Sequence, residues 1–485
     1  MLSEIMPHLS SPVSLLLLGV AIAIACGFEF INGFHDTANS VATVIYTRSL
    51  KPWKAVAWSG VCNFVGVFLG GISVAMGIVK LLPVDLVASS NMSLSLITVF
   101  SMLLASCIWN LATWFVGIPA SSSHALIGGI LGVGVGNAIS KGLPASAGIN
   151  WVKTGEVGLS LLVSPLLGFG VAALAIYILK RVLKDGAIQS RPINDAPPPF
   201  LVRLALVGTS TGVSIAHGSN DGQKGVGLVM LILIAVLPGK FALSPQVNPA
   251  QIQQAESALQ SIELHVSKFA SLPAPKVSNH FLPSAYADNL AAAQNSIVET
   301  SKLAHTIRGE MLMIQEGQEM KSESKLALRK GIYNLESKLS ALEKAGYPVS
   351  EIKPLRKTLT NMVEYAPLWV IVMIAISLGL GTMIGWKRVV ETLGEKIGTS
   401  GLTYAQGTVS QAVAMSMIGV SALAGVPVST THCLSSGIAG SMVASGSSVQ
   451  KSTVRSIGLA WVLTLPVTLG LSCGLFLILK AVFIA

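Results

Sequence analysis

Long apolar stretches joined by short polar connections are the feature that most restricts how this chain can fold. A helix needs roughly 20 apolar residues to cross about 30 Å of hydrocarbon. Eight stretches reach that length: 13–46, 54–82, 93–117, 155–180, 200–238, 366–386, 403–425 and 456–484. Two shorter pieces rich in Gly and Ser, 119–138 and 427–445, fit either spans or re-entrant hairpins. Because 52% of the residues are hydrophobic and 11% are charged, the sequence predicts an all-α polytopic membrane protein with about 10–12 membrane segments and two re-entrant hairpins.

Basic residues gather in three short connections between these stretches. They are Arg48, Lys51 and Lys54; Lys180, Arg181, Lys184, Arg191 and Arg203; and Lys387, Arg388 and Lys396. Short basic loops beside membrane spans face the cytoplasm, so the net charge of +10 indicates a lipid bilayer as partner and not a nucleic acid. We therefore expect a multi-pass protein of the inner (plasma) membrane with both termini outside.

One segment departs from the apolar pattern. Residues 241–363 hold 24 of the 54 charged residues of the chain, and apolar residues such as Leu335, Leu339 and Leu342 recur there at helical spacing. The sequence predicts a soluble helical insertion that faces the periplasm or the cell exterior. The expected domains are a first membrane repeat (1–185), a basic cytoplasmic linker (186–203), the start of a second membrane repeat (204–240), the insertion (241–363) and the rest of the second repeat (364–485).

Two pairs of motifs indicate that the membrane portion repeats itself. The stretch "INGFHDTAN" at 31–39 matches "AHGSNDGQK" at 216–224, and "GIPASSSH" at 117–124 matches "GVPVSTTH" at 425–432. Repeated halves are common in membrane transporters, where the binding site lies between them.

The spacing of the motifs supports this alignment. Asp36 lies 83 residues before Pro119, whereas Asp221 lies 206 residues before Pro427, and the excess of 123 residues equals the length of the insertion. If the basic loops are cytoplasmic, the first helix runs inward and the matching helix after the linker runs outward. The sequence therefore predicts two inverted repeats.

The two aspartates point to a cation site. A carboxylate near the middle of a membrane helix costs about 2.5–3.5 kcal/mol on insertion scales, so such residues face a cavity or a counter-ion. Asp36 and Asp221 occupy equivalent repeat positions, which favours a shared coupling-ion or metal site over a purely structural hydrogen-bonded pair. Nearby glycines allow the backbone to approach closely or to unwind. The other candidates for this central site are the polar neighbours Asn32, His35, Asn39 and Asn220.

The hairpin motifs supply complementary chemistry. Proline is favoured in the first turn of a helix, and hydroxyls beside free backbone N–H groups at the positive end of the helix dipole form an anion cradle. The candidate hydroxyls are Ser121, Ser122, Ser123, Ser429, Thr430 and Thr431. Together they can donate hydrogen bonds to a tetrahedral oxyanion from two sides, although each motif alone also fits a simple helix cap.

These motifs resemble those of the inorganic phosphate transporter (PiT) family, and more closely its bacterial low-affinity Pit-type members. The family carries a signature like G-A-N-D-V-A-N-A in each inverted half and P-[VA]-S-[ST]-[ST]-H at each hairpin. The corresponding stretches here are "GFHDTANS", "GSNDGQKG", "PASSSH" and "PVSTTH". The resemblance covers nearly the whole membrane portion.

The resemblance implies a symporter that imports inorganic phosphate. It implies that Asp36, Asn39, Asp221 and Lys224 lie at the central site, with Lys224, Asn39 and the six hairpin hydroxyls binding phosphate. Two residues depart from the signature, because His35 and Lys224 stand where asparagines usually do. Since both side chains carry titratable nitrogen atoms, we expect coupling to H⁺ rather than Na⁺. The resemblance also allows phosphate to be carried alone or as a neutral complex with Mg²⁺ or another divalent metal.

Several alternatives stay open from the sequence. Lys224 can attract phosphate or pair structurally with Asp221 three residues away, and Glu29, His124, His217 and His432 fit proton relay or a buried hydrogen-bonded role equally well. A sodium-coupled phosphate symporter, a sulfate permease on the same scaffold and a phosphate-responsive sensor are the competing functions. No cofactor is expected and a homo-oligomer is allowed. No nucleophile with a base, metal cluster or nucleotide loop is readable, so an enzyme is not expected.

Overall fold

The computed structural model describes residues 12–79, 92–149, 151–183, 187–192, 196–245, 247–270, 289–315, 321–398, 401–425 and 428–484. Pro427 of the second hairpin motif lies outside these residues. The chain divides into two units, which we call the membrane unit (residues 1–232 and 366–485) and the inserted unit (residues 233–365).

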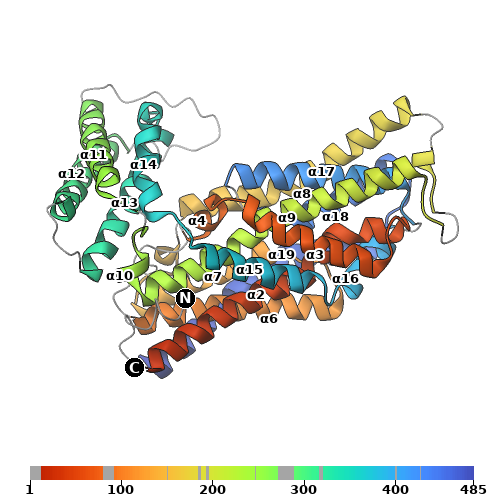
Figure 1. Ribbon diagram of the computed structural model, residues 1–485, viewed down its shortest axis with the longest axis horizontal. Helices are drawn as coiled ribbons and strands as arrows, with labels where there is room; N and C mark the ends of the chain where they lie inside the picture. Colours follow the sequence, from red (N-terminus) through yellow and green to blue (C-terminus); the bar gives the residue numbers. More distant parts are fainter. Residues whose placement is uncertain are drawn as a thin grey trace. The chain divides into compact units, whose positions relative to one another are not determined.

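The regular secondary structure of the described part of the membrane unit is helical, apart from an isolated bridge between Gly398 and Val449 (Figure 1). The first half contains α2 (Pro12–Tyr46), α3 (Pro52–Leu69), α4 (Ser73–Val79), α6 (Met92–Val116), α7 (Ser122–Ser140), η2 (Ala145–Gly148), α8 (Trp151–Val182) and η3 (Ala187–Gln189). The second contains α9 (Phe200–Val236) before the inserted unit and, after it, α15 (Leu368–Thr382), α16 (Lys387–Glu391), η5 (Thr392–Lys396), α17 (Tyr404–Leu423), α18 (Thr430–Ala444) and α19 (Lys451–Phe483).

Six of the described helices are long and apolar enough to cross a bilayer: Leu15–Tyr46, Met92–Val116, Ser122–Ser140, Leu162–Val182, Phe200–Val236 and Lys451–Phe483. This confirms the predicted all-α polytopic membrane protein. The number of passes and the inverted orientation of the halves stay predictions.

Glycines set how closely the membrane helices pack. A Cβ added at Gly132 of α7 would lie 2.2 Å from the Leu469 carbonyl oxygen of α19, and one at Gly440 of α18 would lie 2.2 Å from the Phe169 carbonyl oxygen of α8. Small residues allow this approach, and close packing is the main attraction between helices in lipid. Each helix that follows a hairpin motif therefore packs against a long helix from the other half of the sequence.

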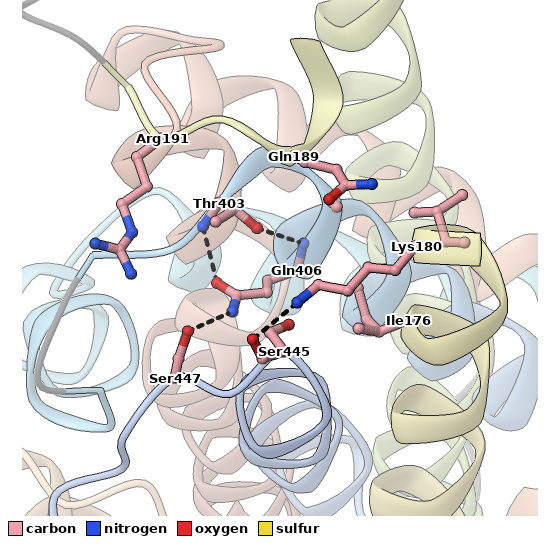
Figure 2. A pocket seen from close by; sticks show the side chains of 10 residues that line it. Ile176, Lys180, Gln189, Arg191, Thr403, Gln406, Ser445 and Ser447 are labelled. Carbon is pink, nitrogen blue, oxygen red and sulfur yellow. Dashed lines mark hydrogen bonds between the residues drawn. The ribbon is translucent and has the colours of Figure 1, made fainter. Parts of the chain in front are cut away.

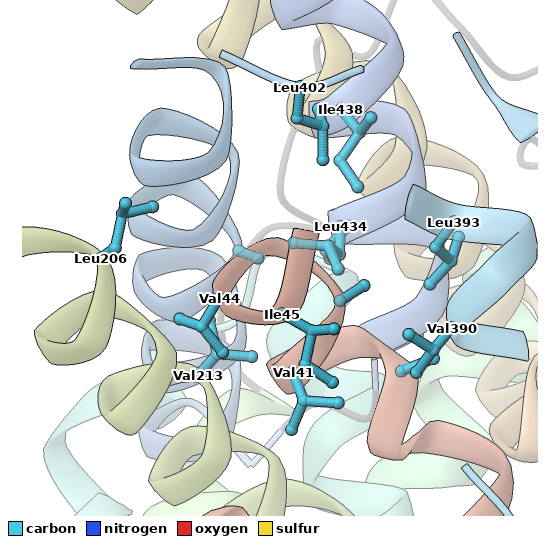
Figure 3. Packing of buried hydrophobic residues seen from close by; sticks show 14 of the residues in the cluster. Val41, Val44, Ile45, Leu206, Val213, Val390, Leu393, Leu402, Leu434 and Ile438 are labelled. Carbon is cyan, nitrogen blue, oxygen red and sulfur yellow. The ribbon is translucent and has the colours of Figure 1, made fainter. Parts of the chain in front are cut away.

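A buried apolar cluster surrounds the carboxyl-terminal part of α2 (Figure 3). Val41, Val44 and Ile45 of α2 pack there with residues from α9, α16, η5 and α18. Because lipid tails are as apolar as these side chains, close van der Waals contact rather than escape from water holds this cluster together.

The inserted unit has the opposite character, since its helices are amphipathic around one core. Its helices are α10 (Pro238–Phe241), α11 (Pro249–Phe269), α12 (Asn289–Gln315), α13 (Ser322–Lys344), η4 (Val349–Ile352) and α14 (Lys353–Val363). The core includes Leu259, Ile307 and Leu335.

A buried arginine joins the two ends of the inserted unit. Arg329 of α13, which is 1% exposed, donates to the carbonyl oxygens of Ala242 at 3.0 Å and Val363 at 2.6 Å. Beside it, the Ser244 backbone N–H donates to the Met362 carbonyl oxygen at 2.8 Å. The segments where the chain enters and leaves the inserted unit are therefore bonded to the same side chain.

Candidate functional site

Asp36 lies at the centre of a buried polar cluster in the membrane unit. Its carboxylate is 3.1 Å from His35 Nδ1, and it accepts hydrogen bonds from Ser122 Oγ at 3.2 Å, Thr430 Oγ1 at 3.3 Å and Thr431 Oγ1 at 3.1 Å. The helix α2 supplies the carboxylate, and the first residues of α7 and α18 supply the hydroxyls. Such a set of donors satisfies a carboxylate that is 3% exposed.

Asp221 of α9 is fully buried beside a buried lysine. Lys224 Nζ lies 2.7 Å from Asp221 Oδ1 and donates to Ser123 Oγ at 2.5 Å. Both Lys224 and Asp221 are 0% exposed. The lysine is therefore both the ion-pair partner of Asp221, as one alternative predicted, and a bridge to the first hairpin motif.

His217 connects the two carboxylates. Its Nε2 lies 3.6 Å from Asp36 Oδ2 and 3.4 Å from Asp221 Oδ2, and its Nδ1 lies 3.1 Å from Asn63 Oδ1 of α3. Asn63 in turn donates to Thr382 Oγ1 of α15 at 2.8 Å. Donor atoms of Asp36, His217 and Asp221 all lie within 4.8 Å of one another, so the three groups could hold a cation.

The sequence left His217 among the weaker candidates. It aligns with Asn32 in the first repeat, so the two repeats do not carry matching imidazoles at this position. The available signal was its position four residues before Asp221, which puts both side chains on one face of a helix.

The hairpin residues divide into two groups. Ser121 and Ser429 cap their helices, since their side chains accept hydrogen bonds from the backbone N–H groups of His124 and His432. The other four hydroxyls reach the charged groups: Ser122, Thr430 and Thr431 bond to Asp36, and Ser123 bonds to Lys224.

Corresponding positions of the two motif pairs make corresponding contacts. Asn39 of α2 donates to Thr431 Oγ1 at 3.0 Å, while Lys224, at the matching position of α9, donates to Ser123, at the matching position of the other hairpin motif. Thus each motif helix bonds to the hairpin motif of the other half.

The remaining candidates lie at the edge of this cluster. Asn32, one helical turn before His35, donates to Glu29 Oε2 at 3.2 Å. The Nε2 atom of His35 lies 3.1 Å from Thr113 Oγ1 of α6. Asn220 is buried. The imidazoles of His124 and His432 lie against each other with ring centres 4.6 Å apart.

The glycines of the motifs permit close approach, and the helices do not unwind there. Both α2 and α9 are continuous through their motifs. A Cβ at Gly33 would lie 2.5 Å from the Leu378 carbonyl oxygen, and one at Gly218 would lie 2.2 Å from the Asn63 carbonyl oxygen. Side chains, rather than freed backbone carbonyls, therefore supply the polar atoms of the site.

Membrane-length helices around buried and mutually bonded charged groups define a class of protein, the polytopic membrane transporters. The family model described as "Phosphate transporter family" matches residues 32–472. The chain belongs to this family, which confirms the resemblance seen in its motifs.

Individual relatives agree with this assignment. The low-affinity inorganic phosphate transporters PitB and PitA of Escherichia coli (strain K12) are each 40% identical over 95% of this chain and 96% of the relative. A probable low-affinity inorganic phosphate transporter of Bacillus subtilis is 35% identical over 45% of this chain and 61% of the relative. A solved structure titled "The sodium-dependent phosphate transporter" shares the fold, with a TM-score of 0.52 and 19% identity over 96% of this chain and all of that one.

Proposed function

We propose that this protein is a symporter of the plasma membrane that imports inorganic phosphate and couples uptake to protons. The observation that carries the proposal is the position of His217 between Asp36 and Asp221, with Lys224 joined to both Asp221 and the first hairpin motif. The relatives named as inorganic phosphate transporters support phosphate as the substrate.

The site contains the groups that an oxyanion requires. Lys224 is a buried cation, and Ser123 lies beside it. The hydroxyls of Ser122, Thr430 and Thr431 converge on Asp36, so three neutral donors that can serve phosphate oxygens lie close together. Charge-assisted bonds from such donors to phosphate oxygens are stronger than neutral ones.

Coupling follows from competition for these hydroxyls. While no proton or other cation is bound to the Asp36 carboxylate, Ser122, Thr430 and Thr431 donate hydrogen bonds to it. A proton or another cation held between Asp36, His217 and Asp221 takes over the carboxylate lone pairs, so the hydroxyls can turn to phosphate. Phosphate then binds best when the cation is present, which is the requirement for symport.

The donor set favours a proton over sodium. Sodium, a hard cation, is held by oxygen ligands, whereas this cluster contains two imidazoles in contact with Asp36 and a lysine in contact with Asp221. A divalent metal carried with phosphate as a neutral complex would find one imidazole nitrogen and two carboxylates, which suit divalent transition metals better than Mg²⁺.

Proteoliposomes separate these forms of coupling. Phosphate accumulation is measured with a proton gradient, a sodium gradient or a gradient of Mg²⁺ imposed one at a time, with sulfate as competitor. We expect accumulation to follow the proton gradient and to resist sulfate. Accumulation that followed sodium and ignored protons would overturn proton coupling while leaving phosphate transport intact.

The two carboxylates are tested separately by Asp36→Asn and Asp221→Asn. Asparagine keeps the volume of aspartate but cannot hold the coupling charge, so each variant should lose accumulation against a gradient while the protein still inserts in the membrane. Losing one partner of a buried charge pair costs about 3–5 kcal/mol, so the amount of each variant in the membrane fraction is measured to check insertion, and size-exclusion chromatography in detergent checks folding. Near-normal accumulation in both variants would remove the carboxylates from the mechanism.

We also infer that the two halves are inverted repeats. The support is the pair of exchanged contacts, Asn39 with Thr431 and Lys224 with Ser123, together with the two serine caps. Opposite orientation of equivalent halves gives a carrier two related conformations, one open to each side.

A further inference from the structure

A polar cavity lies in the membrane unit, lined by residues that are not part of the cluster around Asp36 and Asp221. It has a volume of about 240 Å³ and is lined by Ile176, Leu179, Lys180, Gln189, Arg191, Thr403, Ala405, Gln406, Ser445 and Ser447. This is smaller than the roughly 300–1,000 Å³ of pockets for drug-sized ligands. The cavity therefore suits a small group rather than a large organic molecule.

The charge of the lining indicates an anion. Lys180 and Arg191 contribute two positive charges, and no lining residue is acidic. Figure 2 shows these two basic side chains on either side of Gln406. A guanidinium and an ammonium that face one cavity are the usual partners of a phosphate group.

The elements around the cavity hold these groups in place. Lys180, near the end of α8, donates to the Ser445 carbonyl oxygen after α18 at 2.8 Å. The Tyr404 backbone N–H, at the start of α17, donates to the Ser190 carbonyl oxygen at 3.1 Å. That bond attaches the segment carrying Arg191 to α17.

The first turn of α17 adds to the positive potential. Thr403 and Gln406 form a capping box there, and Gln406 also donates to Ser447 Oγ at 3.2 Å. Thr403, Ala405 and Gln406 line the cavity, so the positive end of the dipole of a 20-residue helix lies at its wall.

The surroundings of Lys180 have the character of a membrane surface. Tyr177 lies one turn before it with the Arg181 guanidinium 4.4 Å from its ring centre, and Leu174 and Ile178 on the same helix are exposed. Tyrosine and basic residues beside exposed apolar residues mark the interface between lipid tails and water. Cytoplasmic lipid surfaces are anionic and attract basic residues.

We propose that this cavity binds a phosphate group, held by Lys180, Arg191 and the first turn of α17, and separate from the transport site. The same chemistry has two sources, the headgroup of an anionic phospholipid and free inorganic phosphate on the side of the basic connections. The proposal does not depend on the direction or coupling of transport.

Chemical protection of Lys180 tests it. The full-length protein in a neutral detergent is treated with a water-soluble acylating reagent, and acylation of Lys180 is measured by mass spectrometry of its peptide. The probes are inorganic phosphate, phosphatidylglycerol micelles and phosphatidylcholine micelles, with sodium chloride matching the ionic strength. Exposed Lys451, which does not line the cavity, is the internal reference.

We expect phosphatidylglycerol, inorganic phosphate or both to slow acylation of Lys180 at least threefold relative to Lys451, while phosphatidylcholine and chloride do not. Protection by phosphatidylglycerol alone identifies a lipid site, and protection by inorganic phosphate identifies a site for the free anion. Protection by neither overturns the proposal.

Variants assign the protection to the cavity. Arg191→Gln removes one charge-assisted bond and should raise the concentration for half-protection about tenfold. Arg181→Gln, a change of the same kind on the residue next to Lys180 that does not line the cavity, should leave it unchanged. Equal protection in the wild type and Arg191→Gln would overturn the assignment.

A final variant separates the cavity from the transport site. In Asp36→Asn, protection of Lys180 by inorganic phosphate should persist, because the cavity shares no residue with the site at Asp36. Loss of that protection would show that phosphate acts on Lys180 from the transport site and would remove the free anion from the proposal.

Discussion

At the scale of single residues, His217 distinguishes this site most clearly from a pair of carboxylates. One imidazole edge faces Asp36 and Asp221, and the opposite nitrogen is held by Asn63. Because Asn63 is itself bonded to Thr382, helices from both halves of the sequence fix the orientation of the ring. A fixed imidazole between two anions can gain and lose a proton without a large movement of the backbone.

Replacing His217 with glutamine should uncouple transport. Glutamine can hydrogen-bond to one carboxylate but cannot carry a proton, so proton-driven phosphate uptake should fall about tenfold or more, in line with the loss of a buried charge-assisted bond. Uptake into proteoliposomes at several pH values measures the effect. His265→Gln is the matched control, because His265 pairs with Glu351 in the inserted unit, and an equal loss in both variants would contradict the role of His217.

At the scale of helices, the membrane unit depends on close approach at a few glycines. Gly132→Ala should push α7 away from α19, because the new Cβ would lie 2.2 Å from a backbone oxygen that cannot yield. Overpacking of this kind costs about 1–3 kcal/mol. A lower thermal midpoint, followed by tryptophan fluorescence in detergent, is the expected result.

The control for this prediction is Gly170→Ala in α8, where an added Cβ meets no atom within 4 Å. Since alanine is the better helix former, this variant should be neutral or more stable by about 0.5–1 kcal/mol. The prediction for Gly132 fails if the two variants shift the midpoint equally.

The sequence predicted which segments would meet but not how they would bond. The repeated motifs predicted that α2 and α9 would meet the two hairpin motifs at one site, because polar residues buried in a membrane need polar partners. Side-chain rotamers and helix rotation decide which hydroxyls reach Asp36 and which cap a helix. Ser122, Thr430 and Thr431 do the first, and Ser121 and Ser429 do the second. No periodicity encodes these, and the position of His217 between the two carboxylates depends on the same features, so the sequence ranked it among the weaker candidates.

At the scale of the whole molecule, the chain combines a unit of apolar, membrane-length helices with an inserted unit of charged helices around its own apolar core. The helix α9 runs to Val236, past residue 232 where the membrane unit ends. The change in composition near 241 coincides with the end of α10 at Phe241, whereas the inserted unit begins at residue 233, inside α9. A boundary inside a continuous helix leaves no mark in the composition of the sequence.

The inserted unit should lose stability in acid through one arginine network. Arg356 donates to both carboxylate oxygens of Glu336, at 2.5 and 3.0 Å, and to Glu343 at 2.8 Å. The hydrogen bond from Arg356 holds the pKa of Glu343 below its usual value. A lowered pKa in the folded state stabilises the fold above the ordinary carboxyl range, and this stabilisation is lost as the pH falls through the lowered pKa.

Arg356→Gln should therefore speed hydrogen exchange in α13 and α14 at neutral pH, by an amount equivalent to about 1–2 kcal/mol. The difference from the wild type should shrink as the pH falls through the lowered pKa of Glu343. Lys357→Gln, a change at an exposed neighbour, should have little effect, and a difference that persisted unchanged in acid would exclude the ion pairs as its cause.

The side of the membrane that the inserted unit faces can be tested with cysteine labelling. We expect Ser322→Cys to react with an impermeant thiol reagent added outside intact cells, and Ala187→Cys, in the basic connection, to react only after the membrane is opened, as the positive-inside rule requires. Both positions are exposed, and the unchanged protein with its five cysteines gives the background. The reverse pattern would place both termini in the cytoplasm.

The clasp at Arg329 has a consequence for how such a protein can change during evolution. Because one side chain grips the carbonyls of Ala242 and Val363, the chain leaves and returns at nearly the same point, and the segment between them behaves as a detachable module. A change in the length or sequence of this module therefore leaves the residues bonded to Asp36 and Asp221 untouched, because none of them lies between Ala242 and Val363.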